Sequence, residues 1–263
     1  MYLEKINGPE DVKKLSMEQL NVLAGEMREA LFHRLTKTGG HFGPNFGVVE
    51  MTIAMHYVFD SPKDKFVFDV SHQTYPHKML TGRAYGYLDE NRFHEISGYS
   101  EPSESEHDIF TIGHTSTSVS LATGLAKGRD AVGGKENIIA VIGDGSLSGG
   151  EALEGLYFAG EMTSHFIVVV NDNEQSIAEI HGGLYKNLTE LRESNGEAPN
   201  NLFRAMGLDY IFEEEGNNIE KLIALFQKVK DINHPIAVHI HTQKGKGYEP
   251  AEENKEAWHW CMP

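Results

Sequence analysis

The 263-residue chain is poor in cysteine, in basic residues and in long apolar runs. Its single cysteine, Cys261, excludes an internal disulfide and a cysteine metal cluster. Acidic residues outnumber basic ones by 39 to 23, and the net charge of −16 disfavours binding to nucleic acid or to an anionic membrane surface. No apolar run approaches membrane-span length, and residues 1–5 lack a signal-peptide layout. We therefore expect a cytoplasmic protein.

The composition that is present is typical of one large α/β domain. Apolar residues make up 40% of the chain and charged residues 24%, and no internal repeat is evident. Helical patterns alternate with short apolar runs, which predicts a parallel β-sheet flanked by helices on both faces. The expected strands lie near residues 66–70, 137–142, 166–170, 208–212 and 236–242. Residues 41–47 are expected to form a glycine-rich loop before a helix.

Polar residues follow two of the predicted strands at the point where each ends. Gly-Asp-Gly closes the first at 143–145, and Asn-Asp-Asn closes the next at 171–173, which places Asp144 and Asn173 29 positions apart. Ligands bind at the carboxyl edge of a parallel sheet, and carboxylate and amide oxygens suit Mg²⁺. Gly-Asp-Gly alone is weak evidence because turns use it often. The pair of motifs, separated by a glycine-opened helix, is much stronger.

This pair of motifs resembles the thiamine diphosphate signature of transketolase-like enzymes. Residues 69–83, 113–118 and 244–252 narrow the resemblance to the 1-deoxy-D-xylulose-5-phosphate synthase family, from about residue 20 to the last residue. The resemblance implies the thiamine diphosphate-binding fold, with residues 1–263 as its diphosphate domain. It also implies that Mg²⁺ is held by Asp144, Asn173 and the backbone carbonyl of Gln175.

The same resemblance implies candidate residues for the cofactor and for catalysis. His41, His72 and His114 are the catalytic candidates, since imidazoles can move protons and stabilise charge on substrate oxygens. The residues expected to bind the cofactor are His41, His72, Gly113, His114, Thr115, Gly143, Asp144, Gly145, Ser146, Asn173, Gln175, Ile177 and Lys244.

Several stretches depart from the family pattern. Ser71 stands where the family usually has glycine, so a positive φ there would be strained. The polar stretch 95–107 is shorter than usual and is read either as a solvated acidic loop, which we favour, or as a lid over the site. Residues 181–201 are also shortened, and residues 214–218 replace the family's Asp-Gly-His signature.

One further pattern has a weak metal-binding interpretation. His239 and His241 would lie on one face of the last strand, a spacing that can bind metal. With no third ligand nearby in sequence, packed or solvent-facing histidines are the favoured interpretation.

The resemblance also implies a reaction and a missing part. Family members decarboxylate pyruvate and join the two-carbon unit to glyceraldehyde 3-phosphate through a thiamine diphosphate carbanion. The glutamate that activates the cofactor belongs to a pyrimidine-binding domain, for which residues 1–263 show no pattern. We expect that domain, in cis or on a second chain, and a homodimer as partners. Two alternatives stay open, namely a subunit of a two-chain transketolase-like enzyme and a non-catalytic cofactor-binding module.

Overall fold

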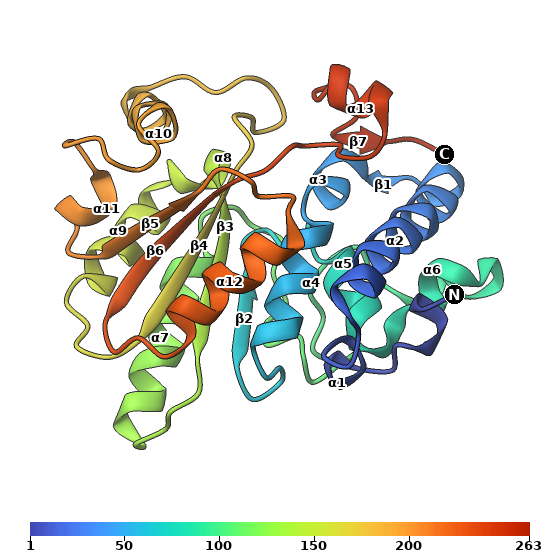
Figure 1. The fold of residues 1–263 in the computed structure, drawn as a ribbon, viewed down its shortest axis with the longest axis horizontal. Helices are drawn as coiled ribbons and strands as arrows, with labels where there is room; N and C mark the ends of the chain where they lie inside the picture. Colours follow the sequence, from blue (N-terminus) through green and yellow to red (C-terminus); the bar gives the residue numbers. More distant parts are fainter.

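A five-stranded parallel sheet lies at the centre of the computed structural model, which describes residues 1–263 (Figure 1). The expected fold class is confirmed, and each strand lies within a few residues of its predicted position. The strands, in their order across the sheet, are β2 (Lys65–Phe68), β3 (Ile138–Gly143), β4 (Phe166–Asp172), β6 (Pro235–His241) and β5 (Asp209–Glu213).

The central strands β3 and β4 are apolar up to their carboxyl ends because the sheet is covered on both sides. All seven residues of β4 are buried. Alternate side chains enter separate cores: Ile139 and Val141 of β3 pack into one cluster, and Ala140 and Ile142 into the other. This alternation follows from the two-residue period of a strand.

Helices from different parts of the chain cover the two faces (Figure 1). The larger core contains apolar residues of α2 (Met17–Thr38), α4 (Val49–Val58) and α12 (Ile219–Lys230). The smaller core contains those of α7 (Ser118–Ala131) and α9 (Gly150–Ala159). None of the helices is both long enough and apolar enough to cross a membrane.

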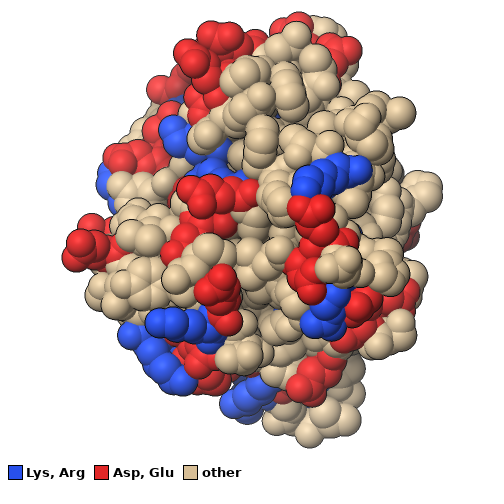
Figure 2. Space-filling view, turned by 90° about the vertical axis from the view of Figure 1, so that its right-hand side faces the viewer, with Lys and Arg blue, Asp and Glu red and all other residues tan.

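Short elements connect these layers. They are η1 (Leu3–Lys5), α1 (Pro9–Val12), α3 (Phe42–Gly47), α5 (Tyr75–Lys78), η2 (Met79–Arg83), α6 (Tyr85–Leu88), η3 (Glu90–Glu95), α8 (Asp144–Leu147), α10 (Gly183–Glu193), α11 (Leu202–Ala205) and α13 (Glu249–Glu253). On the face shown in Figure 2, acidic and basic side chains are interspersed and no continuous basic patch forms.

The loop predicted at residues 41–47 is wrong. His41 belongs to β1 (Gly40–His41), which pairs antiparallel with β7 (Trp260–Cys261), and residues 42–47 form α3. The phenyl rings of Phe42 and Phe46, one helical turn apart, stack with their centroids 4.2 Å apart. These residues are ordered by contacts with the far end of the chain, which local glycine content does not reveal.

Candidate active site

A cavity of about 200 Å³ opens at the carboxyl ends of β2, β3 and β4. Segments that are far apart in sequence meet there, as expected for the edge of a parallel sheet where ligands bind. Its lining residues are His41, Pro44, Val70, His72, Gln73, Thr115, Gly143, Asp144, Gly145, Ser146, Asn173, Gln175, Ser176, Ile177, Lys244 and His259.

Asp144 is a buried carboxylate at this edge, directly after β3. Its oxygens accept hydrogen bonds from the backbone N–H groups of Gly145 (2.8 Å) and Asn173 (3.2 Å), and no Lys or Arg side chain pairs with it. Burial and the neighbouring negative charge of Asp172 raise the pKa of Asp144 well above its usual value. Because the ionised form of such a buried carboxylate is unfavourable, a bound cation would stabilise it.

Two amide oxygens beside Asp144 also lack partners. The side-chain oxygens of Asn173 and Gln175 are buried and accept no hydrogen bond. No three acidic, histidine or cysteine side chains come together as a metal-binding group. A cation here therefore depends on one carboxylate with amide and carbonyl oxygens, a donor set that fits Mg²⁺ once phosphate oxygens and water complete its shell.

Lys244 brings a positive charge to the same cavity, and it is 1% exposed. Its ammonium donates a hydrogen bond to the carbonyl oxygen of Ser176 at 2.7 Å and has no carboxylate partner. Burial lowers the pKa of Lys244 to about 8, and the charge of Asp144 partly opposes that shift. An anionic ligand in the cavity would therefore stabilise the charged form of this lysine.

Gly145 is required where the two strand ends approach each other. A Cβ atom at Gly145 would lie 2.7 Å from the Cβ of Ser176, closer than real Cβ atoms come to one another. The glycine therefore lets the turn after β3 pack against the turn after β4, which carries Asn173 and Gln175.

Three histidines converge on the other side of the cavity. The ring centroid of His41 lies 4.9 Å from that of His72 and 5.5 Å from that of His259, and the His72 and His259 centroids are 5.9 Å apart. Burial lowers the pKa of His41 and of His259 to about 4, and it lowers the pKa of His72 well below its ordinary value of 6.5. Each Nδ1 is buried without a hydrogen-bond partner, so these neutral rings can bind a ligand.

Asn45 holds two of these histidines in place. Its side-chain amide donates hydrogen bonds of 2.8 Å to the carbonyl oxygens of both His41 and His72, and its oxygen accepts one from the N–H of Tyr75 at 3.1 Å. One buried amide therefore ties β1 to the turn after β2.

The turn before His72 contains the backbone strain expected at Ser71. Val70 and Ser71 both have positive φ, 57° and 63°. The buried Ser71 hydroxyl donates to the carbonyl of Ile112 at 2.6 Å and accepts from the N–H of Ser100 at 2.9 Å. These two hydrogen bonds offset the strain, and His72 still lines the cavity.

Comparison with known proteins decides the family. The family model described as 1-deoxy-D-xylulose-5-phosphate synthase matches residues 3–198 and 195–242. The chain belongs to the 1-deoxy-D-xylulose-5-phosphate synthase family.

Its relatives in this family are longer proteins. The 1-deoxy-D-xylulose-5-phosphate synthase of Thermomicrobium roseum is 44% identical over 296 residues, covering 97% of this chain and 46% of that protein. That of Shouchella clausii is 41% identical over 300 residues, covering 100% of this chain and 48% of that protein. The chain thus spans about half the length of these relatives. The alignments are longer than 263 residues, so the synthases contain residues that this chain lacks. The two matches to the family model meet near residues 195–198. This junction lies inside residues 181–201, the stretch expected to be shortened.

Solved structures show the same fold at low identity. Transketolase from Campylobacter jejuni superposes with a TM-score of 0.74 at 18% identity, covering 94% of this chain and 41% of that one. Transketolase from Leishmania mexicana gives a TM-score of 0.69 at 19% identity. These likenesses show that the synthase-family chain has the transketolase fold.

The cavity contains most, but not all, of the site residues that the family resemblance implied. Gly113 and His114 do not line it: His114 is exposed, and its Nδ1 lies 2.9 Å from the carbonyl oxygen of its neighbour Thr115. His259 lines the cavity but was not among the expected site residues. Its match to a family histidine after residues 249–252 was the available signal.

The two histidines of β6 have different surroundings. His239 is buried, with Nε2 2.8 Å from Asp172 and Nδ1 2.8 Å from the hydroxyl of Tyr210. His241 is partly exposed between the carboxylates of Glu174 and Glu214, each at 3.0 Å. The expectation of packed or solvent-facing strand histidines is therefore confirmed.

Proposed function

We propose that this chain is the thiamine diphosphate- and Mg²⁺-binding part of a 1-deoxy-D-xylulose-5-phosphate synthase. The complete enzyme condenses pyruvate with glyceraldehyde 3-phosphate and releases CO₂. The observation that carries this proposal is the buried, unpaired carboxylate of Asp144 beside the unpaired amide oxygen of Asn173, at adjacent strand ends in a member of this family.

In this proposal, Asp144, Asn173 and the backbone carbonyl of Gln175 hold Mg²⁺, and Lys244 faces the anionic end of the cofactor. When bound, thiamine diphosphate supplies the carbon nucleophile for attack on the carbonyl of a 2-oxo acid. The residues of this chain neutralise the diphosphate charge, fix its position and exclude water from the cavity.

His41, His72 and His259 are the proposed groups for handling protons and substrate oxygens. Because each is neutral and has an unpaired Nδ1, each ring can accept or donate one hydrogen bond to a substrate without first losing a partner. His114 remains a proposed cofactor contact because its neighbour Thr115 lines the cavity.

The proposed partner is a pyrimidine-binding domain that carries the activating glutamate, either in the same polypeptide or on a second one. We also propose that the assembled enzyme is a homodimer in the cytoplasm. Measuring the intact mass of the polypeptide made by its native host shows whether the pyrimidine-binding domain belongs to the same polypeptide or to a second one.

Titration calorimetry with thiamine diphosphate and Mg²⁺ tests the binding site. Asp144→Ala should abolish Mg²⁺-dependent binding, whereas Glu154→Gln, on the exposed side of α9, should bind like the wild type. Unchanged cofactor affinity in Asp144→Ala would contradict the metal assignment.

Turnover tests the reaction. The chain, assembled with the domain that carries the glutamate, should release CO₂ from pyruvate and form a five-carbon product with glyceraldehyde 3-phosphate. Cofactor binding without any turnover would favour a non-catalytic module, and turnover with ketose donors alone would favour a transketolase.

A further inference from the structure

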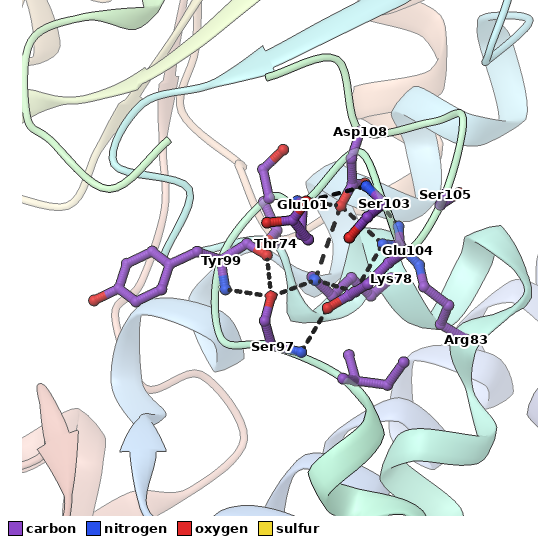
Figure 3. Close-up of polar contacts among 12 residues, drawn as sticks. Thr74, Lys78, Arg83, Ser97, Tyr99, Glu101, Ser103, Glu104, Ser105 and Asp108 are labelled. Atoms are coloured by element: carbon purple, nitrogen blue, oxygen red, sulfur yellow. Dashed lines mark hydrogen bonds and ion pairs between the residues drawn. The ribbon is translucent and has the colours of Figure 1, made fainter. Parts of the chain in front are cut away.

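Residues 97–108, here called the entrance segment, are polar and acidic yet are fastened to the protein by buried charges (Figure 3). The favoured expectation of a solvated acidic loop at residues 95–107 is therefore wrong for Glu104, which anchors the segment together with the following Asp108. The physical reason is that Lys78 and Arg83, beneath the segment, are buried and need carboxylate partners.

Lys78 and Arg83 form a closed network with these two acids. The Lys78 ammonium is fully buried and donates to Glu104 at 2.6 Å and to the hydroxyl of Ser97 at 3.2 Å. Arg83 binds both carboxylate oxygens of Asp108 at 2.8 Å and approaches Glu104 at 3.2 Å. Burial alone would raise the pKa of Glu104, but its hydrogen bonds to Lys78 and Ser97 outweigh burial and lower it. The two acids are thus charged and paired.

The network and Ser71 also hold the backbone on both sides of Tyr99. Glu104 accepts a hydrogen bond from the N–H of Ser97 at 2.7 Å, just before Tyr99. Just after it, the N–H of Ser100 donates to the Ser71 hydroxyl at 2.9 Å. The backbone of Tyr99 therefore has little freedom, although the residue is at the surface.

The side chain of Tyr99 has no structural role that explains its position. It is 39% exposed, belongs to neither hydrophobic core, and its hydroxyl makes no hydrogen bond. Figure 3 shows its ring projecting away from the ion pairs. The ring lies edge-to-face with His41, a cavity residue, with centroids 6.0 Å apart. A rigidly held, exposed aromatic ring beside a binding cavity is suited to contact a ligand.

We propose that Tyr99 is a specificity-determining residue that contacts the acceptor substrate, and that the Lys78–Glu104 and Arg83–Asp108 pairs position it. This inference rests on the proposed function. The ring lies against His41, outside the residues that line the cavity, where it limits the length of an acceptor aldehyde that extends out of the cavity. Lys78, Arg83, Glu104 and Asp108 do not touch the substrate and act only through the entrance segment.

Steady-state kinetics of the assembled enzyme test the substrate contact. Tyr99→Ala should raise the KM for the three-carbon aldehyde about tenfold and reduce discrimination against longer aldehydes, with the Kd for thiamine diphosphate within about twofold of wild type. Tyr99→Phe keeps the ring and should resemble the wild type. An unchanged KM and aldehyde preference in Tyr99→Ala would overturn the proposal, as would an equal loss of cofactor binding.

Amide hydrogen exchange of residues 97–108 and the NMR resonances of the His41 ring test the positioning role in the ligand-free chain. Glu104→Gln should speed exchange there at least about tenfold and shift the His41 resonances, whereas Glu106→Gln, in the same segment and exposed, should change neither. If Glu104→Gln does not fold, Ser97→Ala removes the contact with Lys78 without leaving a charge unpaired. Wild-type exchange in both variants would overturn the positioning role.

These measurements separate the inference from the function on which it rests. A wild-type enzyme that does not turn over pyruvate and glyceraldehyde 3-phosphate contradicts the proposed function. If the wild type turns over normally and Tyr99→Ala has an unchanged KM and aldehyde preference, only the inference about Tyr99 is contradicted.

Discussion

Asp108 and Asp144 are both buried aspartates, yet their surroundings are opposite. Arg83 and His77 contact Asp108, and their hydrogen bonds outweigh burial and hold its pKa well below the usual range. Asp144 has only backbone donors and a neighbouring carboxylate, so its pKa is raised. A buried charge that the protein pairs internally serves the fold, whereas one left unpaired indicates a ligand.

The two buried lysines repeat this contrast. Burial lowers the pKa of both, but Lys78 has Glu104 as a partner, whereas Lys244 has only the carbonyl oxygens of residues 176 and 177. Lys78 therefore belongs to the network under the entrance segment, and Lys244 belongs to the cavity. Variants that remove a partner from a paired charge, or that remove an unpaired charge, test whether pairing explains the difference between the two regions.

The largest change in stability is expected in the ion-pair network under the entrance segment. Asp108→Asn removes the carboxylate that binds Arg83 through two hydrogen bonds, leaving Glu104 as the one carboxylate for both buried Arg83 and buried Lys78, and should lower the free energy of unfolding by about 3–5 kcal/mol. Urea denaturation measures this loss. Glu106→Gln, which removes an exposed and unpaired carboxylate nearby, should stay within about 0.5 kcal/mol of wild type. A small effect of Asp108→Asn would show that the network does not stabilise the fold.

In the cavity, replacing a buried carboxylate is expected to increase the free energy of unfolding. Because ionised Asp144 is unfavourable in the ligand-free protein, Asp144→Asn should raise the free energy of unfolding at neutral pH. The same variant should lose the stabilisation that Mg²⁺ with thiamine diphosphate gives the wild type. Thermal unfolding with and without these ligands measures both. A destabilised ligand-free variant would mean that Asp144 is already compensated.

The two cavity histidines and Asp108 should lose their contributions to stability at different pH. His41 and His259 have folded pKa values of about 4 against an ordinary 6.5, so they are neutral when folded, and the unfolded chain binds protons first as the pH falls. Their contribution is intact above about pH 6.5 and is lost below it, on the order of 1 kcal/mol per pH unit after allowing for partial exposure. Asp108, with a lowered pKa, contributes stability that is lost only below its ordinary value of 3.8.

Denaturation midpoints between about pH 7 and 3 measure these contributions. The double variant His41→Gln/His259→Gln should reduce the dependence near pH 5–6, to which the other buried histidines also contribute, and leave the loss at lower pH. An unchanged slope near pH 5–6 would exclude these two histidines as its cause.

The smallest effect concerns the hydroxyl that joins the two regions. Ser71→Ala keeps the positive φ but loses two hydrogen bonds, at a cost of about 2 kcal/mol. Ser71→Gly loses the same bonds but removes the left-handed strain, so it should be more stable than the alanine variant by roughly 1 kcal/mol. Calorimetric unfolding of the pair measures this difference, and equal stabilities would show that Ser71 is not strained.

Most of the fold could be predicted because its signals are local. The apolar runs of the five strands and the helical patterns between them are contained in short windows, and the sheet buries both of its faces. The helix α3 could not be predicted because His259 and Trp258 supply the carbonyls that accept hydrogen bonds from Phe42 and Gly43.

The cavity residues divide in the same way. Asp144 and Asn173 could be placed together because each directly follows a strand and parallel strands end at one edge. His259 could not be placed because it reaches His41 only through the pairing of β1 with β7. His114 illustrates the reverse case, since a matching motif did not bring its ring into the cavity.

The parallel sheet, the strand ends that carry Asp144 and Asn173, and the resemblance to the synthase family could all be read from the sequence, because they depend on residues close together in the chain. Which buried charges are paired, in contrast, depends on the folded chain. Glu104 lies 26 residues from Lys78, and only the folded chain brings these side chains together while leaving Asp144 without a cation. Pairing depends on distance in space, and an unpaired charge in the low-polarity interior has the larger free-energy cost.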